Sequence, residues 1–111
     1  MQTDSDAPPS PSCGPALELP DTTDERDAAL AGLARALGHP TRVAIVRRLG
    51  AAEACVTEIV GGLSLAQSTV SQHLKVLKEA GIIRGEVVGP KVCYRLLDES
   101  LRTLRGLLEA L

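Results

Sequence analysis

Apolar residues recur at helical spacing along most of the chain, and glycine or proline interrupts them. The first such stretch begins at Thr22, which fits a capping box with Glu25, and it ends at Gly38. A second helix is predicted to start at Pro40 and to end at Gly50, with Val43 on its apolar face and Arg42 pointing outward. Three later helices are predicted: a short one capped by Thr57, one over residues 66–80 that stops at Gly81, and a last one capped by Asp98 with an apolar stripe of Leu101, Leu104, Leu107, Leu108 and Leu111.

Two runs rich in β-forming residues, 82–88 and 91–96, flank Gly89-Pro90 and predict a hairpin. Residues 54–56 are a candidate for a short strand before the third helix. The expected order is therefore helix, helix, short strand, helix, helix, strand, strand, helix, a mostly α (α+β) winged helix-turn-helix. In such a fold the short strand commonly pairs with the second hairpin strand, so we expect Cys55 to lie beside Cys93.

The chain divides by composition into an arm and one domain. Residues 1–21 are rich in proline, serine and aspartate, which predicts a flexible N-terminal arm. Residues 22–111 are expected to form a single winged helix-turn-helix domain for DNA binding and dimerisation. No run of the sequence resembles a membrane span or a signal peptide, and three cysteines do not suggest a secreted disulfide framework, so a cytoplasmic location is expected.

One face of the fourth predicted helix is polar and carries short or amide side chains. With Val70, Leu74 and Leu77 turned inward, the opposite face can present hydrogen-bonding groups to base edges or phosphates in the major groove of DNA. His73 has two interpretations, a DNA contact or a half-buried residue satisfied by a local partner. The candidate DNA-binding residues of this helix and the hairpin are Gln67, Ser68, Thr69, Ser71, Gln72, His73, Lys75, Arg84 and Lys91.

The distribution of charge supports a nucleic-acid partner better than the total does. The formal net charge is −2, but residues 1–27 hold seven of the 14 acidic residues and one of the 12 basic ones. The remaining chain therefore has seven acids and eleven bases, a net charge of +4. Tyr94 is the only aromatic residue, which argues against single-stranded nucleic acid because such sites usually stack bases on aromatic rings.

Three segments together resemble the ArsR/SmtB family of metalloregulatory repressors. They are LAQSTVSQHLKVLKEAGII at 65–83, LGHPTR at 37–42 and GPKVCYRL at 89–96. The resemblance covers roughly residues 28–111. It implies a homodimer formed through the first and last helices, which binds double-stranded operator DNA and leaves it when an effector binds. Ala66 departs from the serine that is common in the family at the cap of the recognition helix, which leaves that helix without a cap oxygen.

The same resemblance directs attention to the cysteines as the effector site. The family's site of acidic and histidine ligands on the last helix is absent, because residues 98–111 contain no histidine. Its Cys-Val-Cys site is incomplete, because the sequence reads Cys55-Val56-Thr57. Some members donate thiols from the N-terminal arm, so Cys13 and Cys55 are the expected ligands of As(III) or Sb(III), an arsenic-type effector, with Cys93 as a third ligand or a packing residue.

Other functions remain open at this point. A thiophilic metal such as Zn, Cd or Pb is an alternative effector, and a reversible disulfide or polysulfide link between Cys55 and Cys93 is another. A winged helix used only for protein contact is a third alternative, against which the basic residues around the polar helix argue. An enzyme is not expected, because the chain has no P-loop, dinucleotide loop, zinc-protease motif or Ser/His/Asp set.

Overall fold

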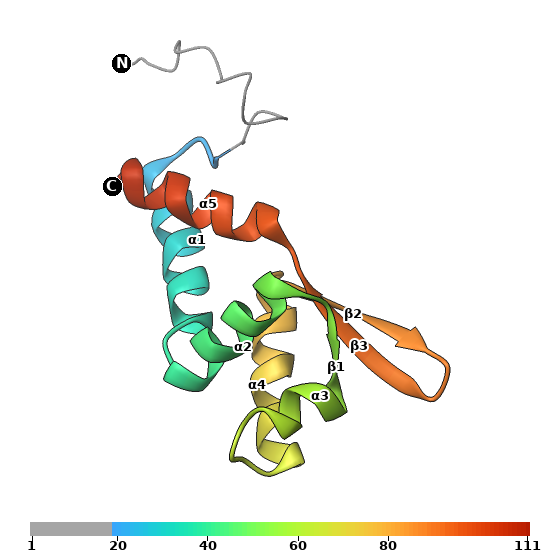
Figure 1. The fold of residues 1–111 in the computed structure, drawn as a ribbon. Coiled ribbons are helices and arrows are strands. Elements are labelled where there is room, and N and C mark those ends of the chain that lie inside the picture. The colour runs from blue at the N-terminus through green and yellow to red at the C-terminus, as the bar shows by residue number, and fades with distance from the viewer. Residues whose placement is uncertain (1–18) are drawn as a thin grey trace.

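The computed structural model describes residues 19–111, so the predicted arm lies mostly outside the described residues. Figure 1 shows α2, α3 and α4 grouped beside a hairpin that projects from the helices, with α5 lying against α1 at the far end. The predicted element order and the winged helix-turn-helix class are confirmed. The elements are α1 (Thr23–Ala36), α2 (Pro40–Ala51), β1 (Ala54–Cys55), α3 (Val56–Gly61), α4 (Gln67–Glu79), β2 (Ile83–Val88), β3 (Lys91–Leu96) and α5 (Asp98–Glu109).

Local sequence signals set several helix ends as predicted. The Thr22 hydroxyl accepts a hydrogen bond from the Glu25 N–H at 3.1 Å, and the Glu25 carboxylate accepts one from the Thr22 N–H at 3.4 Å. These two bonds complete the capping box of α1. Gly81 follows α4 with a φ of +78°, a left-handed conformation that suits glycine.

The predicted caps of α3 and α5 are wrong. The N-cap of α3 is Cys55 rather than Thr57, because Cys55 is still extended and its N–H donates to the Glu58 carboxylate at 2.8 Å. The N-cap of α5 is Leu97 rather than Asp98, because the Leu97 N–H donates to the Ile82 carbonyl at 2.8 Å, next to the start of β2. Cys55 pairs with Cys93 of β3, and Leu97 bonds to Ile82. These contacts with another segment set where each helix begins.

The end of α2 also differs from the prediction. The helix continues past Gly50 to Ala51, and the N–H of Ala52 still donates to the Arg48 carbonyl at 3.3 Å. Gly50 therefore lies within the last turn of α2 and does not end the helix. At the other end of this helix Pro40 is the first residue, as predicted, and the His39 ring accepts a hydrogen bond from the Thr41 N–H at 3.0 Å.

The three strands form an antiparallel sheet in the order β1-β3-β2. The register pairs Cys55 with Cys93, and this confirms the cross-strand neighbours expected from the fold class. Side chains alternate between the two faces of such a sheet. Ile83 and Leu96, which are paired, face the helices, so Arg84, Glu86, Cys93 and their partners lie on the outer face.

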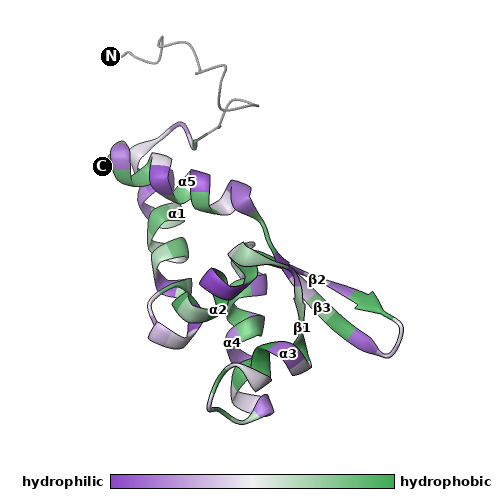
Figure 2. Cartoon of the chain, viewed as in Figure 1, coloured by the Kyte–Doolittle hydropathy of each residue, from purple (hydrophilic) through white to green (hydrophobic). Residues whose placement is uncertain are grey.

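The core is aliphatic and centres on α4. Val70, Leu74 and Leu77 are at most 1% exposed, and they pack with buried residues of α2 and α3 and with Ile82 and Ile83. Figure 2 shows hydrophobic and hydrophilic segments alternating along the helices. Val43, predicted for the apolar face of α2, is instead 40% exposed. None of the helices within residues 19–111 combines the length and the apolar character needed to cross a bilayer.

The first residue before α4 offers a direct test of the capping argument. Ala66 is the N-cap, with extended backbone and no side-chain hydrogen bond to the helix. We expect Ala66→Ser to raise the free energy of unfolding by about 1 kcal/mol, because its hydroxyl satisfies an N–H of the first turn. Urea unfolding of the two proteins measures the change. Ala66→Val is the control without an oxygen, and equal stabilisation by both variants would contradict the prediction.

Candidate DNA-binding face and cysteine pair

The polar face of α4 is exposed as the sequence predicts. Since Val70, Leu74 and Leu77 hold the apolar side against the core, the opposite side chains face solvent over the whole helix. The exposed members are Gln67, Ser68, Thr69, Ser71, Gln72 and Lys75. Helix α3 packs on α4, and a short turn after Gly62 joins the two helices. This is the arrangement in which a second helix can enter a DNA major groove.

A groove separates the start of α4 from the hairpin. It has a volume of about 350 Å³, and its lining includes Thr57, Gln67, Ser71, Lys91 and Tyr94. Lys91 stands next to the hairpin turn, where Gly89 has a φ of +63°. Three of the predicted DNA contacts, Gln67 and Ser71 of α4 and Lys91 of the hairpin, therefore line the same groove.

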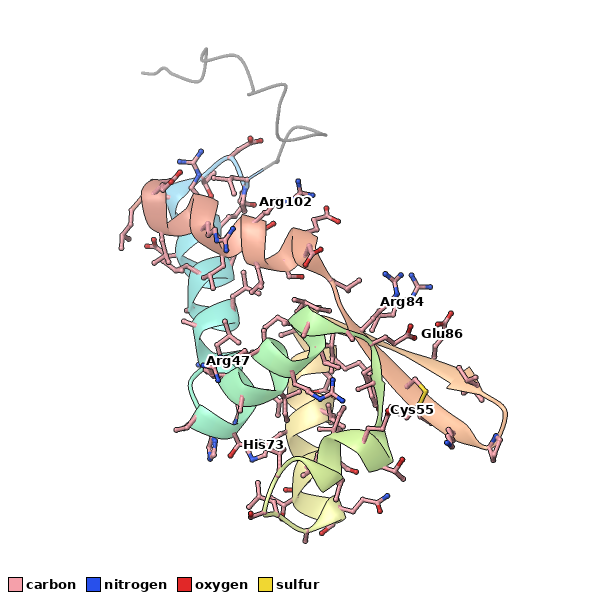
Figure 3. All side chains as sticks on the ribbon, in the orientation of Figure 1. Arg47, Cys55, His73, Arg84, Glu86 and Arg102 are labelled. Atoms are coloured by element: carbon pink, nitrogen blue, oxygen red, sulfur yellow. A yellow bond between two sulfur atoms is a disulfide. The ribbon has the colours of Figure 1, made fainter. Side chains whose placement is uncertain are left out.

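Arg84 lies apart from these residues. It is exposed on the outer face of the sheet, where the register sets it opposite Arg95. Figure 3 shows Arg84 and Glu86 projecting from the hairpin on the side away from α3 and α4. The structure therefore brings Lys91 together with the α4 residues and leaves Arg84 on another surface.

His73 has a local partner, in agreement with one of its two predicted interpretations. It is half-buried, and its Nδ1 accepts a hydrogen bond from the Arg42 Nε at 3.2 Å. Its ring centroid lies 4.5 Å from that of His39. Burial, followed by the nearby His39 and Arg42, lowers the pKa of His73 below the usual histidine value of 6.5.

Arg42 is a residue whose role sequence reasoning missed. It was expected to point outward, but it is half-buried and its guanidinium also donates to the Arg35 and Ala36 carbonyls at 3.0 and 3.1 Å. It therefore joins the end of α1 and the start of α2 to the middle of α4. Nothing in the local sequence signals this, because the three acceptors come from two other helices.

Cys55 and Cys93 are joined by a disulfide between β1 and β3, across 38 residues of sequence. Figure 3 shows the yellow sulfur bond at the junction of β1 with the hairpin. Cys93 is 6% exposed, whereas Cys55 is half-buried on the edge strand. Cys13, the other predicted ligand, lies outside the described residues. Within residues 19–111 no group of three or more His, Cys, Asp or Glu side chains is arranged to hold a metal ion.

Exposed leucines lie near the place where α1 and α5 meet. A groove of about 160 Å³ there has a mixed lining, which includes Leu30, Leu107 and Leu111 as well as Thr23, Arg26 and Asp27. Leu107 is buried, but Leu108 is 53% and Leu111 84% exposed. Part of the predicted leucine stripe therefore packs within the chain, and its end does not.

A family model described as "Bacterial regulatory protein, arsR family" matches residues 39–84. The transcriptional repressor SmtB of Mycobacterium tuberculosis is 46% identical over 87 residues, which are 78% of this chain and 64% of that protein. The chain thus spans less than two thirds of that relative. The transcriptional regulator CmtR of Mycobacterium bovis is 36% identical over 77% of this chain and 72% of its own length. A crystal structure of a "Possible transcriptional regulator for arsenical resistance" superposes with a TM-score of 0.67 at 32% identity, over 71% of this chain and 82% of the other.

The His73 environment predicts a pH dependence of stability. Since its pKa is lowered in the folded protein, the unfolded chain binds more protons below pH 6.5. The contribution of His73 is therefore fully present above that pH and is lost as the pH falls through the lowered pKa. We expect the free energy of unfolding, followed by urea titration from pH 7.5 downward, to decrease in this window.

His73→Asn is the matched control for this measurement, because its side-chain oxygen keeps an acceptor near the position of Nδ1 without titrating. The variant should lose part of the pH dependence and keep most of the stability at pH 7.5. An unchanged pH profile in the variant would show that His73 does not couple protonation to folding.

Proposed function

Because the chain belongs to the arsR family of bacterial regulatory proteins, we propose that it is a homodimeric transcriptional repressor of operator DNA. The observation that carries the proposal is the exposed polar face of α4 beside Lys91 of the hairpin. Serine and amide side chains hydrogen-bond base edges, and lysines bind phosphates. In this proposal α4 enters the major groove and the hairpin tip follows the DNA backbone.

The charge around this face supports the proposal. Residues 64–97 carry five bases and two acids, and of these bases Arg84 and Arg95 lie on the outer face of the sheet rather than beside α4. Lys75 of α4 and Lys91 of the hairpin are both exposed and have no hydrogen-bonded partner in the described part of the chain. Long-range attraction to phosphate depends on such local clusters rather than on the net charge of −2.

Dimerisation is proposed to use the surface where α1 meets α5. Leu108 and Leu111 are large apolar side chains that are 53% and 84% exposed near the end of two packed helices, and exposed apolar side chains that lie close together mark interaction surfaces. A second copy of the same surface, related by a twofold axis, buries Leu108 and Leu111 of both chains. A twofold dimer also presents two copies of α4 to the two half-sites of an operator.

The proposed effector is As(III) or Sb(III), bound by cysteine thiolates. Cys55 and Cys93 lie side by side and supply two sulfur ligands once their disulfide is reduced, and Cys13 is the proposed third. The solved structure described as a "Possible transcriptional regulator for arsenical resistance" supports a metalloid effector. Zn, Cd or Pb at the same thiols is the alternative.

DNA binding is tested by substituting the two lysines of the proposed face. We expect Lys75→Ala and Lys91→Ala each to weaken binding in fluorescence anisotropy. The plot of log affinity against log salt should become shallower by about 0.9 for each phosphate that the protein no longer neutralises. Arg47→Ala removes an exposed base of α2 away from this face and serves as the control. Absence of binding by the unsubstituted protein at low salt would refute the proposal.

The dimer is tested by placing charge on the exposed leucines. Leu108→Glu combined with Leu111→Glu should convert the dimer to a monomer in sedimentation velocity, because two carboxylates from each chain would be buried against each other. Val87→Glu alters a residue of β2 that is 77% exposed and should leave the dimer intact. A monomeric unsubstituted protein, or an unaffected double variant, contradicts this interface.

The effector is tested by titrating arsenite into the complex of reduced protein and DNA. Release of DNA is expected, and Cys55→Ser should abolish it, because one of the two adjacent thiols is removed. Cys13→Ser tests the contribution of the arm separately. The oxidised protein, with its disulfide closed, should not respond. Normal release by Cys55→Ser would reject the thiol site, and release by Cd or Zn alone would favour the alternative effector.

A further inference from the structure

The two helices of the proposed dimer surface form a layer of their own. In the described part of the chain α1 and α5 pack mainly against each other, and they make few close backbone contacts with α2, α3 and α4. Figure 1 shows the pair at the end of the molecule away from α3. The helices proposed to hold the dimer together and the helix proposed to read DNA are therefore separate parts of the fold, and the contacts between these parts fix their relative orientation.

Apolar side chains make one kind of contact between the two parts. Ala36 of α1 is 2% exposed, and Leu33, Leu37 and Leu101 pack against the same core. Hydrophobic burial is non-directional, so this contact opposes separation of the two parts more than it opposes their rotation. Hydrogen bonds require a defined distance and angle, and they can therefore set an orientation.

Arg42 of α2 provides a directional link from α1 to the middle of α4. Its Nη1 donates to the Arg35 and Ala36 carbonyls at 3.0 and 3.1 Å, at the end of α1 where the helix dipole also favours a cation. Its Nε donates to Nδ1 of His73 at 3.2 Å. Because the donors of a guanidinium are fixed in one plane, the side chain joins these three acceptors in a single geometry.

Ser100 of α5 provides a second directional link, at the end of α4. Its hydroxyl donates to the carbonyl of Gly81, which follows the last turn of α4. Close to it in the chain, the Leu97 N–H donates to the Ile82 carbonyl at 2.8 Å. The recognition helix is therefore attached to α1 at its middle and to α5 at its end, and two attachment points along one helix restrict both its tilt and its rotation.

We propose that Arg42 and Ser100 are positioning residues that set the distance and the angle between the two copies of α4 in the dimer, and so select the spacing of the operator half-sites. This inference rests on the proposed function. One additional base pair moves a half-site by about 3.4 Å along the DNA axis and turns it by about 35°. With both links intact, α4 cannot follow this movement unless a link breaks. Without them, it turns against the apolar contacts alone.

A role in stability alone gives a different expectation. A residue that only stabilises the fold changes the affinity for operators of every spacing by the same factor, whereas a positioning residue changes the ratio of the affinities for two spacings. This ratio also cancels the general loss of attraction to phosphate on removal of a cation, because that loss applies at every spacing. The preference for one spacing over another therefore separates the two roles.

The spacing preference is measured by fluorescence anisotropy of the reduced protein on a duplex selected from a random pool, and on the same duplex with one base pair inserted or deleted between the half-sites. Arg42→Gln and Ser100→Ala should each lower the preference by about two- to tenfold, the range expected for one net hydrogen bond. Arg42→Lys keeps the charge but not the planar fork, so it should lower the preference as well. Ser100→Thr keeps the hydroxyl and should retain the parent value.

Arg47→Gln removes an exposed base from α2 and is the control for the loss of charge. An unchanged spacing preference in Arg42→Gln, Arg42→Lys and Ser100→Ala, with each variant dimeric in sedimentation velocity, would overturn the proposal. If the parent does not bind DNA at all, the repressor function fails instead, and the orientation of α4 is decided by a measurement that needs no DNA.

That measurement is electron–electron double resonance between α1 and α4. Nitroxide labels on Ala31→Cys and Gln72→Cys, two exposed positions, are placed in a chain whose three native cysteines are replaced by serine. Dilution with unlabelled protein leaves only the distance within one chain. Arg42→Gln should broaden the distribution of this distance, and Arg47→Gln should not. Ser100→Ala, which removes a single hydroxyl, gives the same test if Arg42→Gln does not fold. Distributions equal to that of the parent would overturn the positioning role.

Discussion

The packing of the apolar side of α4 is the constraint on which the rest of the molecule depends. Val70, Leu74 and Leu77 are almost fully buried against α2, α3 and the start of β2. Because this side of α4 is fixed against the core, the serine and glutamine side chains on the other side of the helix are exposed to solvent. Arg42 of α2 stabilises the same arrangement, because it donates hydrogen bonds to His73 of α4 and to a carbonyl of α1. The proposed reading of DNA by α4 needs a helix whose rotation is set before DNA arrives, and this packing provides it.

The two faces of the sheet have different roles. Its inner face, with Ile83 and Leu96, holds the hairpin against the helices, while its outer face carries the disulfide and the arginines. Cys55 and Lys91 both line the groove beside α4. The disulfide therefore borders the same space as the first turns of α4.

Much of the fold could be predicted from the sequence because its signals are local. Thr22 with Glu25, Gly81 after α4, and the two β-rich runs about Gly89 are signals that need only their neighbours. The pairing of Cys55 with Cys93 followed from the fold class. The missed features depend on partners distant in sequence. Arg42 turns inward to carbonyls of α1, α3 begins where β1 stops pairing, and Arg84 is separated from the α4 face by the sheet. The placement of Cys13 relative to the other thiols is a hypothesis outside the described residues.

The most direct test of the account is methylation protection of guanine N7, an atom of the major groove, on a duplex that the reduced protein selects from a random pool. Two copies of α4 in a twofold dimer should protect guanines in two patches whose centres lie about one helical turn, or about 10 base pairs, apart. Loss of both patches in a Gln67→Ala/Ser71→Ala variant would assign them to α4. Binding without major-groove protection, or a single patch, would contradict the claim that this face reads DNA as a dimer.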